Sequence, residues 1–147
     1  MPGITSEWKL YSNDNNLNYY IRIFDFGHKM NTWRVGREVR SMPFQVGEAE
    51  FSIDIYPNGN TKENRGNISV FVNNKNNWDV KVDIEFSIGT KSLELVAEEM
   101  EANTSWGWPT YCDHDDARNL FDDGQRYKFC KWFLMKGSEI MFCGQII

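Results

Sequence analysis

The chain has 147 residues, a formal net charge of −5 at pH 7, and 15% aromatic residues. A chain of this length most naturally forms one domain, which buries roughly 68–70% of its unfolded surface and needs no disulfides for stability. Its basic residues are scattered rather than gathered into a stripe, which argues against nucleic acid as a partner. No apolar run approaches the length of a membrane span, and the N-terminus lacks a basic start and an apolar segment. We therefore expect a soluble, cytoplasmic protein with no membrane partner.

The cysteines and tryptophans add two constraints. Cys112, Cys130 and Cys143 form no close-spaced pair, and their odd number argues against a disulfide framework, which fits a reducing compartment. The six tryptophans are spread over the whole chain. Large rings of this kind fill the core of a β-sandwich as readily as they contact a ligand, so their number alone does not indicate a binding site.

The N-terminal residues 1–18 are polar and rich in asparagine, and we expect a tail there, in which Trp8 and Leu10 could add a short edge strand. Residues 19–147 are predicted to form the domain. Tyr19 to Phe26 alternates with the period of two that is typical of a strand, and the segment from His28 to Gly36 is expected to be a loop. A second strand is predicted from Arg37 to Phe44.

The stretch from Phe51 to Val72 contains the clearest pair of strands. Phe51–Tyr56 alternates apolar and polar residues, as does Gly66–Val72. Between them, Tyr56-Pro57-Asn58-Gly59 predicts a turn, because proline has no amide hydrogen to donate and the Asn-Gly pair tolerates positive φ. These two strands are the expected centre of the fold.

A hairpin is predicted next, with strands Val80–Ile88 and Ser92–Met100 joined by a short turn. Ser105–Pro109 reads Ser-Trp-Gly-Trp-Pro and is expected to be a loop because of its glycine and proline. His114–Leu120 predicts one or two helical turns, since aspartates near a helix N-terminus are stabilised by free amide hydrogens and the helix dipole.

The C-terminal part predicts a strand over Tyr127–Met135, a turn, and a last strand over Glu139–Gln145. The pattern of about eight strands with regular turns and almost no helix indicates an all-β protein. We predict an antiparallel eight-stranded β-sandwich with one short helix.

The order of several separated motifs resembles the MATH (meprin and TRAF homology) domain over about Tyr19 to Trp132. The motifs that carry this resemblance are Tyr56-Pro57-Asn58-Gly59, Ile68-Ser69-Val70-Phe71, Phe86-Ser87-Ile88, Trp106-Gly107-Trp108-Pro109, His114-Asp115-Asp116, Asp122-Asp123 and Phe129-Cys130. The resemblance implies a TRAF-like sandwich that binds short peptide segments of partner proteins in a shallow groove on one sheet. In some members of the family, such a domain recruits substrates for a ubiquitin-pathway or signalling protein.

The resemblance also implies which residues line the groove. Carried over position by position, they are Asn67, Ile84, Glu98, Met100, Ser105, Trp106, Gly107 and Trp108. A partner segment would lie across the strands around Val80–Ile88 and before Met100, with Trp106 and Trp108 closing one end. Glu98 would favour a basic or hydroxyl-bearing residue of the partner. Affinity would come from main-chain hydrogen bonds along an edge strand.

No pattern in the chain indicates an enzyme or a cofactor. Cys112, His114 and the neighbouring aspartates could bind zinc, with Cys130 or Cys143, but ligands so close in sequence point in different directions. We therefore predict no metal site. A nucleophilic Cys–His pair is open in principle, although cysteines in apolar strands are more often small core residues.

A second function from another class uses the same tryptophans. In a jelly-roll-like lectin, Trp106 and Trp108 would stack on sugar rings while nearby aspartates or asparagines bind hydroxyl groups. The motif order favours the peptide-binding module, and no calcium-binding loop supports the lectin.

Overall fold

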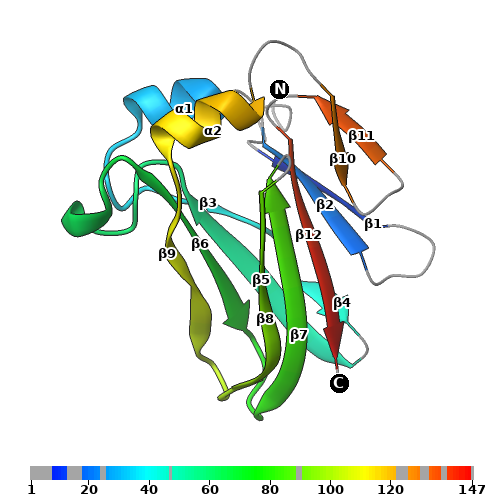
Figure 1. Ribbon diagram of the computed structural model, residues 1–147. Coiled ribbons are helices and arrows are strands. Elements are labelled where there is room, and N and C mark those ends of the chain that lie inside the picture. The colour runs from blue at the N-terminus through cyan, green and yellow to red at the C-terminus, as the bar shows by residue number, and fades with distance from the viewer. Residues whose placement is uncertain are drawn as a thin grey trace, which may run out of the picture.

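The prediction of an all-β antiparallel sandwich is confirmed in the structure, which is a computed structural model (Figure 1). The ranges that the structure describes are residues 8–12, 18–23, 26–46, 48–88, 91–121, 126–129, 133–136 and 139–146. Twelve strand segments and two short helices lie in these ranges, rather than the eight strands and one helix predicted. No helix among them is long and apolar enough to cross a membrane.

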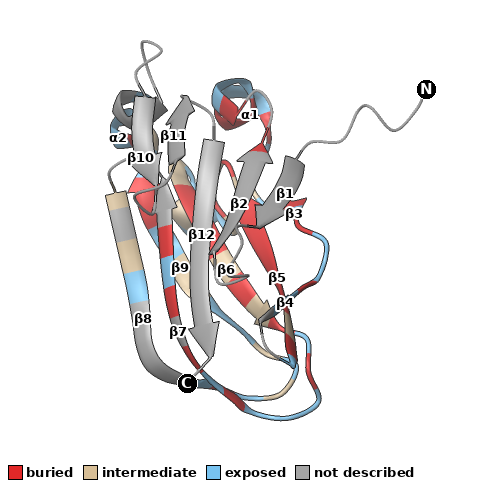
Figure 2. Ribbon diagram, turned by 90° about the vertical axis from the view of Figure 1, so that its right-hand side faces the viewer, coloured by how far each residue is buried: buried red, intermediate tan, exposed pale blue. Residues whose placement is uncertain are grey.

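Two five-stranded sheets form the layers of the sandwich. The β7 sheet has the order β1 (Trp8–Ser12), β2 (Asn18–Ile23), β12 (Glu139–Ile146), β7 (Val80–Ile88), β8 (Lys91–Met100). The β6 sheet has the order β3 (Val39–Arg40), β5 (Ala49–Tyr56), β6 (Asn67–Asn74), β9 (Ser105–Asp113), and β4 (Phe44–Val46) also pairs with β5. The other elements are α1 (Phe26–Thr32), a 3₁₀ turn (Lys62–Asn64), α2 (His114–Phe121), β10 (Arg126–Phe129) and β11 (Phe133–Lys136). Both α-helices lie at the same end of the sandwich (Figures 1 and 2).

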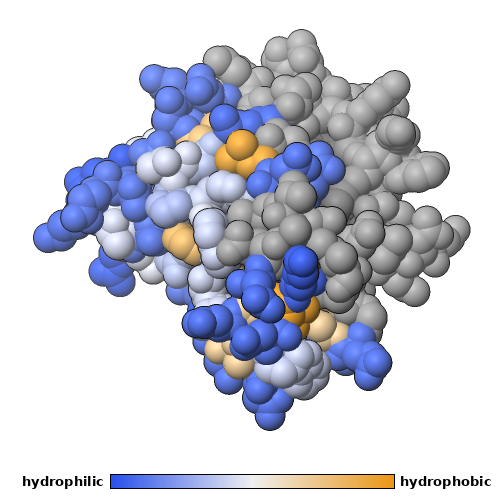
Figure 3. Space-filling model, turned by 60° about the horizontal axis from the view of Figure 1, so that its bottom comes forward, coloured by the Kyte–Doolittle hydropathy of each residue, from blue (hydrophilic) through white to orange (hydrophobic). Residues whose placement is uncertain are grey.

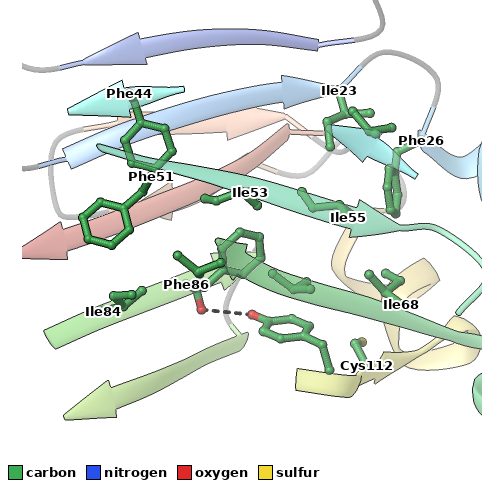
Figure 4. Close-up of a cluster of buried hydrophobic side chains, with 14 of the residues drawn as sticks. Ile23, Phe26, Phe44, Phe51, Ile53, Ile55, Ile68, Ile84, Phe86 and Cys112 are labelled. Carbon is green, nitrogen blue, oxygen red and sulfur yellow. Dashed lines mark hydrogen bonds between the residues drawn. The ribbon is translucent and has the colours of Figure 1, made fainter. Parts of the chain in front are cut away.

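The hydrophobic core lies between the two sheets and follows the alternation in the sequence. On β7, the buried side chains are those of Val80, Val82, Ile84 and Phe86, as predicted for one face of that strand. Ile53, Ile55 and Ile68 meet them from the β6 sheet and are at most 1% exposed (Figure 4). The strands predicted around Phe51–Tyr56 and Gly66–Val72 are confirmed as β5 and β6, which pair with each other in the centre of the sheet.

The predicted turn at Tyr56-Pro57-Asn58-Gly59 is confirmed, and Asn58 fixes it on two sides. Its side-chain nitrogen donates to the Trp33 carbonyl oxygen at 3.1 Å, and its side-chain oxygen accepts from the Gly66 backbone amide at 2.9 Å. Gly59 has φ of +89°, and a Cβ there would overlap the backbone at Asn64. Glycine is therefore required both by the turn and by the close approach of the following loop.

The segment His28–Gly36, expected to be a loop, instead begins inside a helix. Phe26, Met30 and Trp33 are buried at positions i, i+4 and i+7, which is the spacing of a helix face that packs on a core. The spacing is present in the sequence, but Gly27 lies within it, and glycine disfavours a helix. The prediction of a loop that begins at His28 is wrong.

Three further predictions need correction. The strand expected over Arg37–Phe44 is interrupted after β3, and β4 begins only at Phe44, beyond Pro43. The single strand expected over Tyr127–Met135 divides into β10 and β11, which pair with each other, with Phe129 opposite Phe133. Ser105–Pro109 is not a loop but the first half of strand β9. By contrast, the helix at His114 and the last strand are confirmed, and Trp8–Ser12 forms the edge strand β1.

A buried pair of asparagines holds together the end of the sandwich opposite the helices. Asn74 and Asn76 are 2% and 4% exposed. The side-chain nitrogen of Asn74 donates to the carbonyl oxygens of Trp78, Met100 and Glu101 at 3.1–3.2 Å. Its side-chain oxygen accepts from the backbone and side-chain nitrogens of Asn76, at 2.9 and 2.7 Å. One side chain thus joins the β6–β7 connection to the end of β8.

We predict that Asn74→Ala lowers the free energy of unfolding by about 2–4 kcal/mol, because one buried and two partly buried carbonyl oxygens lose their donor at once. The measurement is urea-induced unfolding followed by tryptophan fluorescence. Asn77→Ala, at an exposed position of the same connection, is the matched control and should change stability by no more than about 0.5 kcal/mol. Equal effects of the two substitutions would contradict this account of the asparagine pair.

Candidate functional site

Strand β9 lies at the edge of the β6 sheet, and β8 lies at the edge of the β7 sheet. Both edges are on the same side of the sandwich, which we call the β8–β9 side (Figures 1 and 2). In the part of the chain that the structure describes, β9 pairs only with β6, and its other edge carries no strand.

The pairing of β9 with β6 fixes which backbone groups point away from the sheet. Asn74 donates its amide to the Thr104 carbonyl oxygen at 2.8 Å, just before β9 begins. In an antiparallel pair, hydrogen-bonded and non-hydrogen-bonded residues alternate, so Trp106 and Trp108 bond toward β6. The amide and carbonyl groups of Ser105 and Gly107 consequently point to the outer edge.

Trp106 and Trp108 lie opposite Val72 and Val70 of β6, on the face of the sheet that carries the core. Trp106 is 40% exposed, and Trp108 is half-buried. Because β9 is an edge strand, both rings reach the β8–β9 side. The other large hydrophobic side chains exposed in the described residues, Met42 and Trp78, lie in the β3–β4 and β6–β7 connections, outside this strand.

Trp108 is held in place by aromatic neighbours from both sheets. Its ring centroid lies 6.3 Å from that of Phe86 on β7 and 6.1 Å from that of Tyr111 on its own strand. The Tyr111 hydroxyl shares its hydrogen between the carbonyl oxygens of Phe86, at 3.1 Å, and Lys91, at 2.8 Å. These contacts join β9 to the β7 sheet, so the exposed edge is part of a rigid structure.

The strand accommodates its proline through an irregularity in register between Ile68 and Val70. Pro109 faces this point, and its carbonyl oxygen accepts from the Ser69 hydroxyl at 2.6 Å. Proline is compatible with an edge strand because no neighbour needs its amide hydrogen. Glycine and proline therefore indicated a loop in a segment that forms an irregular edge strand.

The residues predicted to line a groove do not all reach the β8–β9 side. Ile84 and Met100 are 3% and 0% exposed, so their side chains belong to the core, and the prediction is corrected for these two residues. Asn67 is half-buried and lies opposite Asp113, at the far end of β6 from the tryptophans. Glu98 is on β8, where its backbone lies opposite Val82 of β7, and its side chain is not described by the structure. Ser105, Trp106, Gly107 and Trp108 do lie together on β9.

The Cys112–Asp116 segment has a structural explanation. Cys112 is buried, and its thiol donates to the Asp113 carbonyl oxygen at 3.4 Å. A His114 ring nitrogen lies 2.7 Å from the Pro57 carbonyl oxygen, which ties α2 to the β5–β6 turn. The Asp113 carboxylate accepts from the Asp116 amide at 2.8 Å and thereby caps α2. Within the described ranges, no three side chains of the His, Cys, Asp or Glu type are placed to hold a metal ion.

The described surface seen in Figure 3 is mainly hydrophilic, and its hydrophobic residues form small, separate patches. The described residues on this face therefore form no broad apolar patch. The more specific feature of the molecule is the β9 edge, with its outward backbone groups and exposed tryptophan.

Fold and site together define a small antiparallel β-sandwich in which β9 is an accessible, aromatic edge strand. A family model described as the MATH domain matches residues 18–125. The match covers more than half of the chain, which therefore belongs to the MATH domain family. MATH domains are in general protein–protein interaction modules rather than enzymes. A search of curated proteins gives no match.

Gly107 generates a prediction about the edge strand itself. A Cβ at this position would overlap the Val70 carbonyl oxygen and lie 2.6 Å from the Phe71 Cα, and both are backbone atoms that cannot move aside. We expect Gly107→Ala to lower the free energy of unfolding by about 1–3 kcal/mol, as overpacking does. Gly27→Ala is the control, because nothing lies within 4 Å of its Cβ position and alanine favours the helix. If both variants unfold at the same urea concentration, the close approach of β9 to β6 is not as described.

Cys112 generates a prediction about pH. Burial raises the pKa of the Cys112 thiol from 9.0 to about 11, although Lys91 partly offsets the effect. The folded state therefore retains the thiol proton in a range where the unfolded state loses it, and stability should fall as pH rises from about 9 to about 11. Urea unfolding of the wild type and Cys112→Ala across this range measures the difference. The fall should be smaller in the variant, and identical pH profiles would exclude this thiol as the cause.

Proposed function

We propose that this protein binds a short, extended segment of a partner protein as an additional strand on the outer edge of β9. The observation that carries the proposal is the outward direction of the Ser105 and Gly107 backbone groups on an edge strand. An added strand gains affinity from main-chain hydrogen bonds and specificity from side-chain contacts beside them.

Trp106 is the proposed anchor of that contact. The residue is 40% exposed although its backbone is fixed by pairing with β6. A large aromatic ring on a rigid strand loses little conformational freedom on binding, and residues of this type dominate the energy of many interfaces. Trp108, held against Phe86 and Tyr111, would supply the adjoining surface. Glu98 remains a proposed contact at the edge of the neighbouring sheet.

Pro109 limits how long the added strand can be. It cannot donate an amide hydrogen, and its carbonyl oxygen is already bonded to Ser69. Regular main-chain pairing would therefore be confined to the Ser105–Gly107 part of the strand. This favours recognition of a short linear segment over pairing with a long strand of another folded domain.

We extend the proposal to the setting of the interaction. Membership of the MATH family supports recruitment of the bound protein to a ubiquitin-pathway or signalling assembly, and the buried free thiol of Cys112 is compatible with a cytoplasmic site of action. We also propose that the functional domain spans residues 19–147. Support for the C-terminal limit comes from β12, which pairs with both β2 and β7.

Two substitutions at one position test the role of the backbone. Ser105→Pro removes an outward amide hydrogen that β6 does not use, whereas Ser105→Ala keeps it, and both lose the same side-chain bond to Asn73. Peptides selected from a random display library on the wild-type protein should bind Ser105→Pro on the order of tenfold more weakly than Ser105→Ala, as measured by fluorescence polarisation. Equal affinities would contradict strand addition at this edge.

Trp106→Ala tests the anchor and separates the proposal from sugar binding. The selected peptides should bind this variant on the order of tenfold more weakly, since a hot-spot ring is lost. A glycan array provides the competing outcome. If the wild type binds a glycan, selects no peptide, and loses glycan binding in Trp106→Ala, the edge serves a lectin and the peptide proposal is wrong.

A further inference from the structure

Lys91 is the first residue of β8 and lies beside the aromatic cluster of the β8–β9 side. Its ammonium nitrogen is 6.0 Å from the centre of the Tyr111 ring, and its carbonyl oxygen accepts the Tyr111 hydroxyl. Tyr111 in turn contacts Trp108. A lysine, a tyrosine and a tryptophan thus form a continuous row from β8 into β9.

The Lys91 ammonium group carries no ion pair in the parts of the chain described by the structure. A cation 6 Å from a tyrosine ring gains only a weak attraction, so its charge remains available to an anion. Asp113, at the end of β9, and Asp116, in the first turn of α2, lie close enough to Cys112 to act on its pKa, as Lys91 does. Both are exposed, and the Asp113 carboxylate already accepts from the Asp116 amide. On β8 itself, the exposed Glu94 is three residues away and therefore on the opposite face of the strand.

The position of Lys91 along the edge indicates which part of a partner segment it would contact. It contacts Tyr111, which follows Pro109, whereas the outward backbone groups of Ser105 and Gly107 precede Pro109. A partner segment that continues past Pro109 leaves the region of main-chain pairing and needs a side-chain contact instead. An ammonium group there suits a carboxylate.

We propose that Lys91 selects a carboxylate-bearing residue in the partner segment, at the end that lies beyond Pro109. This inference rests on the proposed strand addition at β9 and assigns a side-chain preference to it. With strands rising about 3.3 Å per residue, the selected residue lies roughly three to four positions from the one that pairs with Gly107. The recognised segment is therefore a short β-forming stretch followed or preceded by Asp or Glu at a fixed spacing.

The test is selection from a random peptide display library on the wild type and on Lys91→Glu. The wild type should enrich Asp or Glu at one fixed position of the selected motif, and Lys91→Glu should enrich Lys or Arg there. Peptides from the wild-type selection should bind Lys91→Glu on the order of tenfold more weakly by fluorescence polarisation, and the difference should shrink as salt concentration rises.

Lys81→Glu is the matched control, because Lys81 is an exposed lysine on β7 between the buried Val80 and Val82, and so faces away from the core. It should keep the wild-type preference. Two outcomes would overturn the role of Lys91 but leave the proposed strand addition standing. One is an identical acidic preference in the wild type and Lys91→Glu, and the other is a selected motif that requires Trp106 but has no charge preference. Failure of the wild type to select any peptide that depends on Trp106 overturns the proposed strand addition and this inference with it.

Discussion

The shared hydrogen bond of the Tyr111 hydroxyl is the interaction on which the architecture of the β8–β9 side depends. Both sheets end here, and no strand in the described residues closes the gap between their edges. Tyr111 is 1% exposed and reaches from β9 to two carbonyl groups of the other sheet. A buried hydroxyl that lost these partners would carry an uncompensated desolvation cost, so the bond holds the two edges at one separation.

This constraint explains how an exposed edge strand can also be a well-defined one. The Phe86, Trp108 and Tyr111 rings lie with centroids 5.4–6.3 Å apart, which fixes Trp108 and leaves Trp106 as the accessible ring. Binding residues on a strand that is already positioned lose little freedom when a partner arrives. The helices cap one end of the sandwich (Figure 1), and the asparagine pair joins the end of β6 to the end of β8 at the other.

Where a single pattern determined the local structure, the sequence was sufficient to predict that structure. The alternation along β5, β6 and β7 predicted both strands and core faces, and the aspartates in the first turn of α2 predicted its start. The failures occurred where two signals competed. Phe26, Met30 and Trp33 carried helical spacing, but Gly27 suggested a break, and the helix formed because its apolar face is buried. Trp-Gly-Trp-Pro resembled a loop, yet pairing with β6 made it a strand.

The candidate site was predictable only in part, for the same reason. The grouping of Ser105 to Trp108 follows from their adjacency in the sequence, whereas the burial of Ile84 and Met100 depends on which face of each strand meets the core. The contact between Tyr111 and Lys91 joins positions 20 residues apart on strands of different sheets. No local pattern encodes such a pair.

An accessible edge strand is also a risk, since it can pair with any other exposed edge. The two edges on the β8–β9 side meet this risk in different ways. The pairing of β8 with β7 shifts in register between Val82 and Ile84 of β7, and β8 carries exposed charges at Glu94 and Glu99. Both features oppose the approach of another strand. β9 has few charges, but Pro109 and the irregularity beside it interrupt its run of outward donors. The features that prevent indiscriminate pairing at β9 are therefore the ones that would restrict it to a short partner segment.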